Sequence, residues 1–262
     1  MTRIRLDQLL VERGLARSRG EASALLLAGE VELAGAGSRT LKPGQLVASD
    51  AQLSVIPRPR WASRAGDKLE AALDAFRIGP HGLACLDAGA STGGFSDVLL
   101  ARGARIVYAV DVGRGQLIDR LRLDPRVVSM ERTNLRDLHR LPEPIDLATL
   151  DLSFISLRLV LPAVHRLLTD AGRVIALVKP QFEAGREAVP RGGVVRDPAT
   201  HRAVLTRFAA DAAAAGFSPR AAIGSPITGA DGNREFLVLL GSDAPSELDW
   251  AVQVERLLPS PV

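Results

Sequence analysis

The stretch LDAGASTGGFSDVLL, residues 86–100, decides the fold. An apolar run ends at Asp87, a glycine-rich turn follows, and an apolar pattern with helical spacing begins after the turn. This order lets the backbone approach a ligand closely and points the N–H groups of a helix N-terminus at it. The glycines at 89, 93 and 94 do not follow G-x-G-x-x-G, and Asp87 puts a carboxylate where a pyrophosphate would lie. The turn therefore favours a cationic ligand over a dinucleotide.

Strand-like runs alternate with helical patterns on both sides of this turn, from Leu83 to Lys179. Such alternation predicts an α/β fold with a mostly parallel sheet covered on both faces, and ligands that bind at the carboxyl ends of the strands. Asp111 closes the next strand about twenty residues on, where a carboxylate can accept from ribose hydroxyls. Asn134 follows the third strand, where it either contacts a bound ligand or simply caps a helix.

Four charged residues fall where the chain would bring them to this edge. Asp151 ends the fourth strand and Lys179 the fifth, Lys68 begins a helix before the sheet, and Glu235 opens the last strand. The chain has thirty arginines and only three lysines, and two of the three lysines are in this set. Lysine can give up its proton when its surroundings favour the neutral amine, whereas arginine stays charged. The alternative is a structural ion pair between Lys179 and Glu235.

The basic excess of the chain belongs to its N-terminal quarter. Residues 1–64 hold ten Lys/Arg against six Asp/Glu, so +4, and the rest holds 23 against 24, so −1. This asymmetry indicates a small module that faces a polyanion, although a solvated surface rich in arginine would look the same. Two short helices, the second capped by Ser18, precede three strand-like segments, which predicts an ααβββ unit.

This N-terminal pattern resembles the alpha-L RNA-binding module, on the motifs R-L-D at 5–7, S-R at 18–19 and G-x-V at 29–31. The resemblance implies that arginines of this module and of the connector after it contact RNA phosphates, while Asp7 braces the helix pair. The predicted contacts are Arg5, Arg17, Arg19, Arg60 and Arg64. The basic, proline-containing connector predicts a domain boundary. Trp61 in this connector either docks it on the following domain or transmits RNA contact to that domain.

Lysine, aspartate, lysine and glutamate in this chain order resemble the catalytic tetrad of FtsJ-like RNA ribose 2′-O-methyltransferases. Together with DLSFIS, VKPQFE and GGVVRDP, the whole chain resembles the TlyA family, ribosomal-RNA 2′-O-methyltransferases that are also called haemolysins. SRAGDKL departs from the family's S-R-G-x-x-K-L around Lys68. The resemblance implies a Rossmann-like, seven-stranded catalytic domain that transfers a methyl group from S-adenosylmethionine to cytidine in ribosomal RNA of the large subunit, with the small subunit as a second candidate.

The same resemblance implies the residues of the site and the boundaries of the domains. The cofactor site comprises Asp87, Gly89, Ala90, Ser91, Thr92, Gly93, Gly94, Phe95, Asp111, Asn134 and Asp151. Lys179 is the base or, if it stays charged, stabilises the developing alkoxide; Asp151 and Glu235 orient it, and Lys68 holds the ribose. The predicted parts are an RNA-binding domain at 1–57, a linker at 58–64, the methyltransferase domain at 65–243 and a helical tail at 244–262.

Composition limits the other readings. A single cysteine, an N-terminus without an apolar signal and no apolar run of about twenty residues indicate a cytoplasmic protein outside the membrane. Four scattered histidines predict no metal site. We expect a monomer that works on ribosomal subunits, with residues 185–197 as a mobile lip that orders over RNA.

Three alternatives stay open at this stage. DLSF lies where exocyclic-amine methyltransferases keep D/N-P-P-Y/F, although the prolines are missing. A non-catalytic ribosome-binding or assembly factor would use the basic module, and a cytolysin would need an amphipathic membrane element that the sequence does not show.

Overall fold

The computed structural model describes residues 3–34, 41–55, 60–185, 187–229, 231–242 and 247–258. The chain forms two compact units, Met1–Pro59 and Arg60–Val262. Part of the predicted linker, residues 58 and 59, and much of the predicted tail, residues 244–246 and 259–262, lie outside the described residues.

The first unit packs two helices against two short antiparallel strand pairs. Its elements in order are β1 (Arg3–Arg5), α1 (Leu6–Glu12), α2 (Arg19–Leu27), β2 (Val31–Leu33), β3 (Leu46–Ala48) and β4 (Leu53–Val55). β1 pairs with β3, and β2 pairs with β4. The Ser18 side chain accepts from the Glu21 N–H, which confirms the predicted cap. β1 is an addition to the predicted ααβββ order, because three residues are too few to show alternation in sequence and only the pairing with β3 defines the strand.

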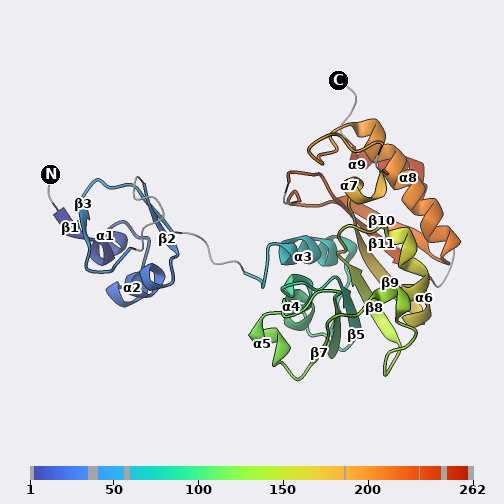
Figure 1. Ribbon diagram of the computed structural model, residues 1–262, viewed down its shortest axis with the longest axis horizontal. Helices are drawn as coiled ribbons and strands as arrows, with labels where there is room; N and C mark the ends of the chain where they lie inside the picture. Colours follow the sequence, from blue (N-terminus) through green and yellow to red (C-terminus); the bar gives the residue numbers. More distant parts are fainter. Residues whose placement is uncertain are drawn as a thin grey trace. The chain divides into compact units, whose positions relative to one another are not determined.

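The second unit is a seven-stranded sheet in the order β10-β11-β9-β8-β5-β6-β7 (Figure 1). β11 is antiparallel to both of its neighbours, and the other pairs are parallel. The predicted α/β fold with a mostly parallel sheet is confirmed. The strands are β5 (Ala84–Ala88), β6 (Ile106–Val110), β7 (Val127–Met130), β8 (Ile145–Leu150), β9 (Leu168–Val178), β10 (Ser218–Gly224) and β11 (Phe236–Gly241).

Helices cover both faces of this sheet. The faces separate by alternation: in β5, Leu86 joins one hydrophobic cluster and Cys85 the other. On the Cys85 face lie α3 (Ala65–Phe76), α4 (Gly94–Ala101) and α5 (Asp119–Arg122). On the Leu86 face lie the 3-10 turns η1 (Leu135–Asp137) and η2 (Leu157–Leu159) and the helices α6 (Leu161–Leu167), α8 (Pro198–Ala214) and α9 (Trp250–Leu257). The short α7 (Pro180–Glu183) follows β9 directly.

The C-terminal helix α9 belongs to this core. The indole of Trp250 donates to the Leu205 carbonyl of α8 at 3.0 Å, and Gln253 donates to the Ala222 carbonyl of β10 at 2.8 Å. Val254 and Leu257 pack into the Leu86-face cluster. The described part of the predicted tail, residues 247–258, contains the helix α9, which adds to the core of the second unit.

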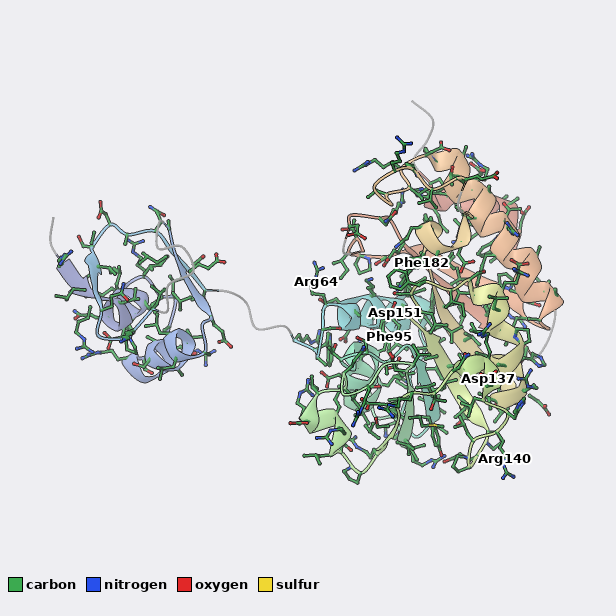
Figure 2. All side chains as sticks on the ribbon, in the orientation of Figure 1. Arg64, Phe95, Asp137, Arg140, Asp151 and Phe182 are labelled. Atoms are coloured by element: carbon green, nitrogen blue, oxygen red, sulfur yellow. The ribbon has the colours of Figure 1, made fainter. Side chains whose placement is uncertain are left out.

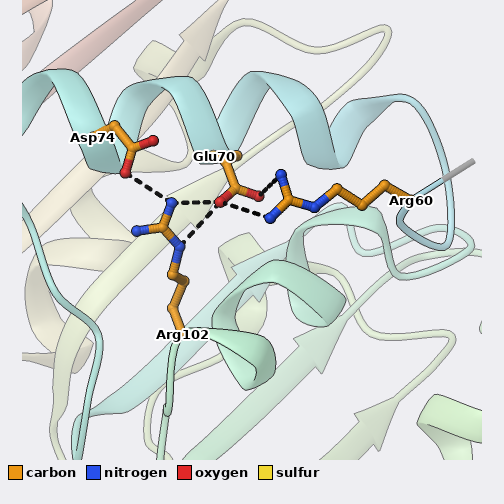
Figure 3. A network of polar contacts seen from close by, with 4 residues as sticks. All are labelled: Arg60, Glu70, Asp74 and Arg102. Carbon is orange, nitrogen blue, oxygen red and sulfur yellow. Dashed lines mark hydrogen bonds and ion pairs between the residues drawn. The ribbon is translucent and has the colours of Figure 1, made fainter.

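The second unit begins with a segment fastened to α3. Trp61 is 8% exposed and packs in the Cys85-face cluster, so it docks this segment on the body. Arg60 lies over the Trp61 ring and pairs with Glu70, which also binds Arg102 from the end of α4 (Figure 3). Arg102 in turn contacts Asp74 at 2.7 Å. Arg60, predicted to contact RNA, is thus part of a network that joins α3 to α4, although its side chain stays 67% exposed.

Candidate active site

Asp151 and Lys179 meet at the carboxyl edge of the sheet. β8 ends at Leu150 and β9 at Val178, and the two strands are parallel neighbours, so the next residue of each lies at the same edge. The Lys179 amine lies 2.6 Å from an Asp151 carboxylate oxygen and donates to Ser153 Oγ at 3.0 Å. The Lys179 side chain is 9% exposed, so this contact is largely shielded from water.

A second lysine–carboxylate pair faces the same space. Lys68, in the first turn of α3, donates to Glu235 Oε2 at 2.5 Å, and both side chains are buried. The four charged residues line one cavity of about 420 Å³, called the first cavity below. Phe95, Asp151 and Phe182, which also line it, are labelled in Figure 2. The sequence predicts that both carboxylates orient Lys179, whereas the structure pairs Glu235 with Lys68.

The glycine-rich turn forms one side of the first cavity, and its glycines lie tightly against neighbouring segments. Gly89 has φ +86°, and a Cβ on it would lie 2.4 Å from the Asp151 carbonyl oxygen. A Cβ on Gly94 would lie 2.3 Å from Ser63 Oγ. Side chains at these positions would push the turn away from the segments that carry Asp151 and Lys68. Of the predicted turn residues, those that line the cavity are Gly89, Ala90, Ser91, Thr92, Gly94 and Phe95.

A second cavity of about 500 Å³ adjoins the first and shares Gly89, Ser91 and Asp151 with it. Asp111 and Asn134, two of the predicted cofactor residues, line this second cavity. The Asp111 carboxylate accepts from the backbone N–H groups of Ser91 and Gly113, at 2.8 and 2.7 Å, which fixes its direction. Asn134 also caps the η1 turn, since its side chain accepts from the Arg136 N–H. Asn134 therefore caps η1 and also lines the second cavity, so the predictions of a cap and of a ligand contact are compatible.

Asp87 and Gly93, which are also among the predicted cofactor residues, line neither cavity. Asp87 is fully buried in β5 and accepts from the N–H and the hydroxyl of Ser96, at 2.8 and 2.6 Å. Burial raises the pKa of Asp87 to about 7, and the nearby charges of Asp151 and Asp111 add to this. Asp87 thus holds the start of α4 through Ser96. Gly93 has a φ of +97°, and a Cβ on it would clash with the Leu121 side chain.

The sequence reading missed a set of contacts that joins the segment after β8 to α7. Phe154 and Phe182 lie with ring centroids 5.0 Å apart. Glu183 accepts from the Ser156 hydroxyl at 2.6 Å and the Leu157 N–H at 2.8 Å, and burial raises its pKa. Together with the contact between Lys179 and Asp151, these bonds hold the segment DLSFIS against the segment VKPQFE. Each motif alone shows an acidic or basic strand end, and nothing in either one indicates the pairing.

Phe154 is the most exposed large apolar side chain in the part of the chain that the structure describes, at 90%. Its φ is +63°, an uncommon conformation for a bulky residue, and it borders both cavities. A strained backbone that presents an aromatic ring to solvent beside a site indicates a binding role.

The predicted RNA-contacting arginines of the first unit differ in their surroundings. Arg5 and Arg19 both pair with the buried carboxylate of Asp7, at 2.9 and 3.1 Å, and the Arg5 contact above all lowers the pKa of Asp7 to about 2. Asp7 therefore braces α1 against α2, as predicted. Arg17 is exposed, and Arg64 of the second unit is exposed at the first cavity.

The predicted lip is tied to the last strand by Asn233, which is 1% exposed. Its side chain accepts from the Val195 N–H and donates to the Gly193 carbonyl, both at 2.9 Å. His201 lies 3.1 Å from the Val195 carbonyl. The end of the lip is therefore held two residues from Glu235.

Within the described ranges, no three or more His, Cys, Asp or Glu side chains gather as a metal site would require. Over the same residues, no helix has the length and apolar character needed to cross a membrane.

This sheet order, with a glycine turn and the two cavities at the carboxyl edge, defines an α/β methyltransferase fold. It is similar to a Listeria monocytogenes structure provisionally named a methyltransferase, with a TM-score of 0.50 and 19% identity over 68% of this chain and 99% of that one. The model of the FtsJ-like methyltransferase family matches residues 61–242. The chain belongs to this family and is a methyltransferase.

Its relatives extend beyond the catalytic domain. It is 49% identical to YqxC of Bacillus subtilis over 90% of this chain and 85% of YqxC. It is 46% identical to the 16S/23S rRNA (cytidine-2′-O)-methyltransferase TlyA of Mycobacterium tuberculosis, over 91% of this chain and 90% of that one. A Streptococcus thermophilus structure provisionally named a hemolysin has a TM-score of 0.75 and 42% identity, over 98% of this chain and 94% of that one.

Proposed function

We propose that this protein transfers a methyl group from S-adenosylmethionine to the ribose 2′-hydroxyl of a cytidine in ribosomal RNA. One observation carries the proposal: two buried lysine–carboxylate pairs, Lys68 with Glu235 and Lys179 with Asp151, face one cavity beside a glycine turn. The similarity to a relative named as a 16S/23S rRNA (cytidine-2′-O)-methyltransferase supports the choice of substrate.

The residues of the two cavities fit this methyl donor. Asp111 can accept from ribose hydroxyls with its remaining lone pairs, and Asn134 lies beside it for the adenine. The turn from Gly89 to Phe95, whose Gly89 Cα leaves no room for a Cβ, would hold the methionine part. When bound, the donor supplies a methyl group on a positively charged sulfur, which makes the methyl carbon open to attack.

Lys179 is the residue that we assign to the 2′-hydroxyl. A ribose hydroxyl is a weak nucleophile, so its oxygen must be aligned and its proton taken or its developing charge stabilised. The Lys179 amine, held by Asp151 and Ser153, can take the proton or, as a cation, stabilise the alkoxide. Lys68, held by Glu235, would bind the ribose from the other side of the cavity.

Each of the two units offers side chains that would contact RNA. The ring of Phe154 offers a stacking surface for a base that leaves the RNA helix, which is how proteins commonly read single-stranded RNA. Arg5, Arg17 and Arg19 of the first unit, an RNA-binding domain in this proposal, would contact phosphates and position the enzyme. The enzyme would then act as a monomer on ribosomal subunits in the cytoplasm.

The test uses purified protein, labelled S-adenosylmethionine and isolated small and large ribosomal subunits that lack the modification. We expect label in RNA, and one site that resists alkaline hydrolysis, because a 2′-O-methyl group blocks cleavage there. Label in RNA without a resistant site would indicate methylation of a base amine and would overturn the proposal. No transfer to either subunit would overturn it as well.

A further inference from the structure

The first cavity contains a polar group that the proposed chemistry does not use, the side-chain amide of Gln181. Its Oε1 atom is buried and has no hydrogen-bond partner among the described residues. Trp61, Glu70 and Asp87 also have such an atom, but Gln181 is the one of the four whose residue lines the first cavity. A buried acceptor without a partner costs stability, so it needs an explanation.

The placement of Gln181 associates it with the substrate side of the site. It lies on α7, two residues after Lys179 and directly before Phe182, whose ring contacts Phe154. It lines the first cavity and not the second, where Asp111 and Asn134 lie. The amide therefore shares a wall with the aromatic pair and the lysine that we assign to the 2′-hydroxyl.

An amide offers one acceptor and two donors on a planar group. The Watson–Crick edge of an unpaired base presents a donor beside an acceptor, and in cytosine the donor is the exocyclic N4 amine. A base stacked on Phe154 would need its edge satisfied inside the cavity, and an unpartnered amide on the adjoining helix provides the matching groups.

We propose that Gln181 is a specificity-determining residue whose amide hydrogen-bonds to the base edge of the nucleotide that is methylated. This inference rests on the proposed function, since it assumes an RNA nucleotide in the first cavity. The oxygen has almost no exposed surface in the free protein, so the side chain must rotate toward the cavity to make this bond, and the oxygen then gains a partner.

The experiment compares Gln181→Leu with the wild-type enzyme in three measurements: thermal unfolding of the free protein, S-adenosylmethionine affinity by calorimetry, and kcat/KM on ribosomal subunits. Leucine removes the unpartnered acceptor at similar volume, so the Tm should be unchanged or higher. Donor affinity should be unchanged, and kcat/KM should fall about tenfold, mostly through KM. Gln181→Glu replaces the amide NH2 by a second acceptor oxygen and so loses both donors, and its kcat/KM should fall as well.

A matched control is Gln253→Leu, which removes a glutamine bonded to the Ala222 carbonyl outside both cavities. It should lower the Tm and leave kcat/KM unchanged, the opposite of the pattern at Gln181. Subunits with the target base replaced give a second readout: the wild-type enzyme should discriminate against the replacement, and Gln181→Leu should discriminate less.

The inference is overturned if Gln181→Leu keeps the wild-type kcat/KM and base preference, if it loses donor affinity, or if it loses stability as Gln253→Leu does. Each of these results leaves the proposed function intact, because the wild-type enzyme still methylates the RNA. Absence of methylation by the wild-type enzyme is the separate result that removes the proposed function itself.

Discussion

At the scale of single residues, the charged groups of the site have different tasks that only their surroundings reveal. Asp151 follows β8 and Asp87 is the last residue but one of β5, yet Asp151 lines the first cavity and Asp87 is fully buried. The sequence shows an acidic strand end in both cases. Alternation along β5 decides the difference, because Asp87 points toward α4 and not toward the carboxyl edge.

Asp87 gives a prediction about pH. Its folded pKa of about 7 lies above the ordinary value of 3.8 for an aspartate, so the folded state holds a proton that the unfolded state releases. Protonated Asp87 therefore favours the folded state at low pH, and this stabilisation is lost as pH rises through about 7. We expect Asp87→Asn to gain in Tm relative to the wild-type protein as pH increases from about 4 to 8. Thermal unfolding across this range measures it, and a Tm difference that does not change with pH would contradict it.

At the scale of elements, the strands and their ends were predictable and the connections between loops were not. The apolar runs that end at Asp151 and Lys179 predict β8 and β9 and their shared edge. The contacts of Phe154 with Phe182 and of Glu183 with Ser156 depend on two loops that only the folded sheet brings together.

Asn233 gives a prediction for the lip at 185–197. Asn233→Ala leaves the Val195 N–H buried without an acceptor, which should lower the free energy of unfolding by about 1–3 kcal/mol. Cleavage by trypsin after Arg191 or Arg196 should become faster. Asn233→Asp keeps the acceptor for Val195 and should lie between the alanine variant and the wild-type protein. Equal cleavage of all three proteins would show that Asn233 does not hold the lip.

At the scale of the whole molecule, the chain combines a basic unit with a nearly neutral one. The charge difference and the motifs of the first 60 residues are visible in sequence, and so is the chain order of the four catalytic candidates. What the sequence leaves open is how these four residues pair. Glu235 pairs with Lys68, whose helix α3 contacts β11, and Asp151 pairs with Lys179, which follows the strand beside β8.

Arg17 gives a prediction for the basic unit. Its side chain is exposed, so it can contact a phosphate without breaking the Asp7 cluster. Arg17→Ala should weaken binding to ribosomal RNA, and the slope of log K against log salt should fall by about 1. Arg207→Ala, on the exposed face of α8, is the matched control and should bind as the wild-type protein does. The same slope for Arg17→Ala and the wild-type protein would exclude a phosphate contact at Arg17.

The central claim is that Lys179 acts on the ribose hydroxyl beside the methyl donor. The most direct measurement is the single-turnover rate of methylation by Lys179→Ala on ribosomal subunits, with donor affinity measured on the same protein. Positioned proton transfer contributes about 10²–10⁴ to a rate, so the variant should lose at least about a hundredfold while it binds S-adenosylmethionine as the wild-type enzyme does. A rate near that of the wild-type enzyme would contradict the account.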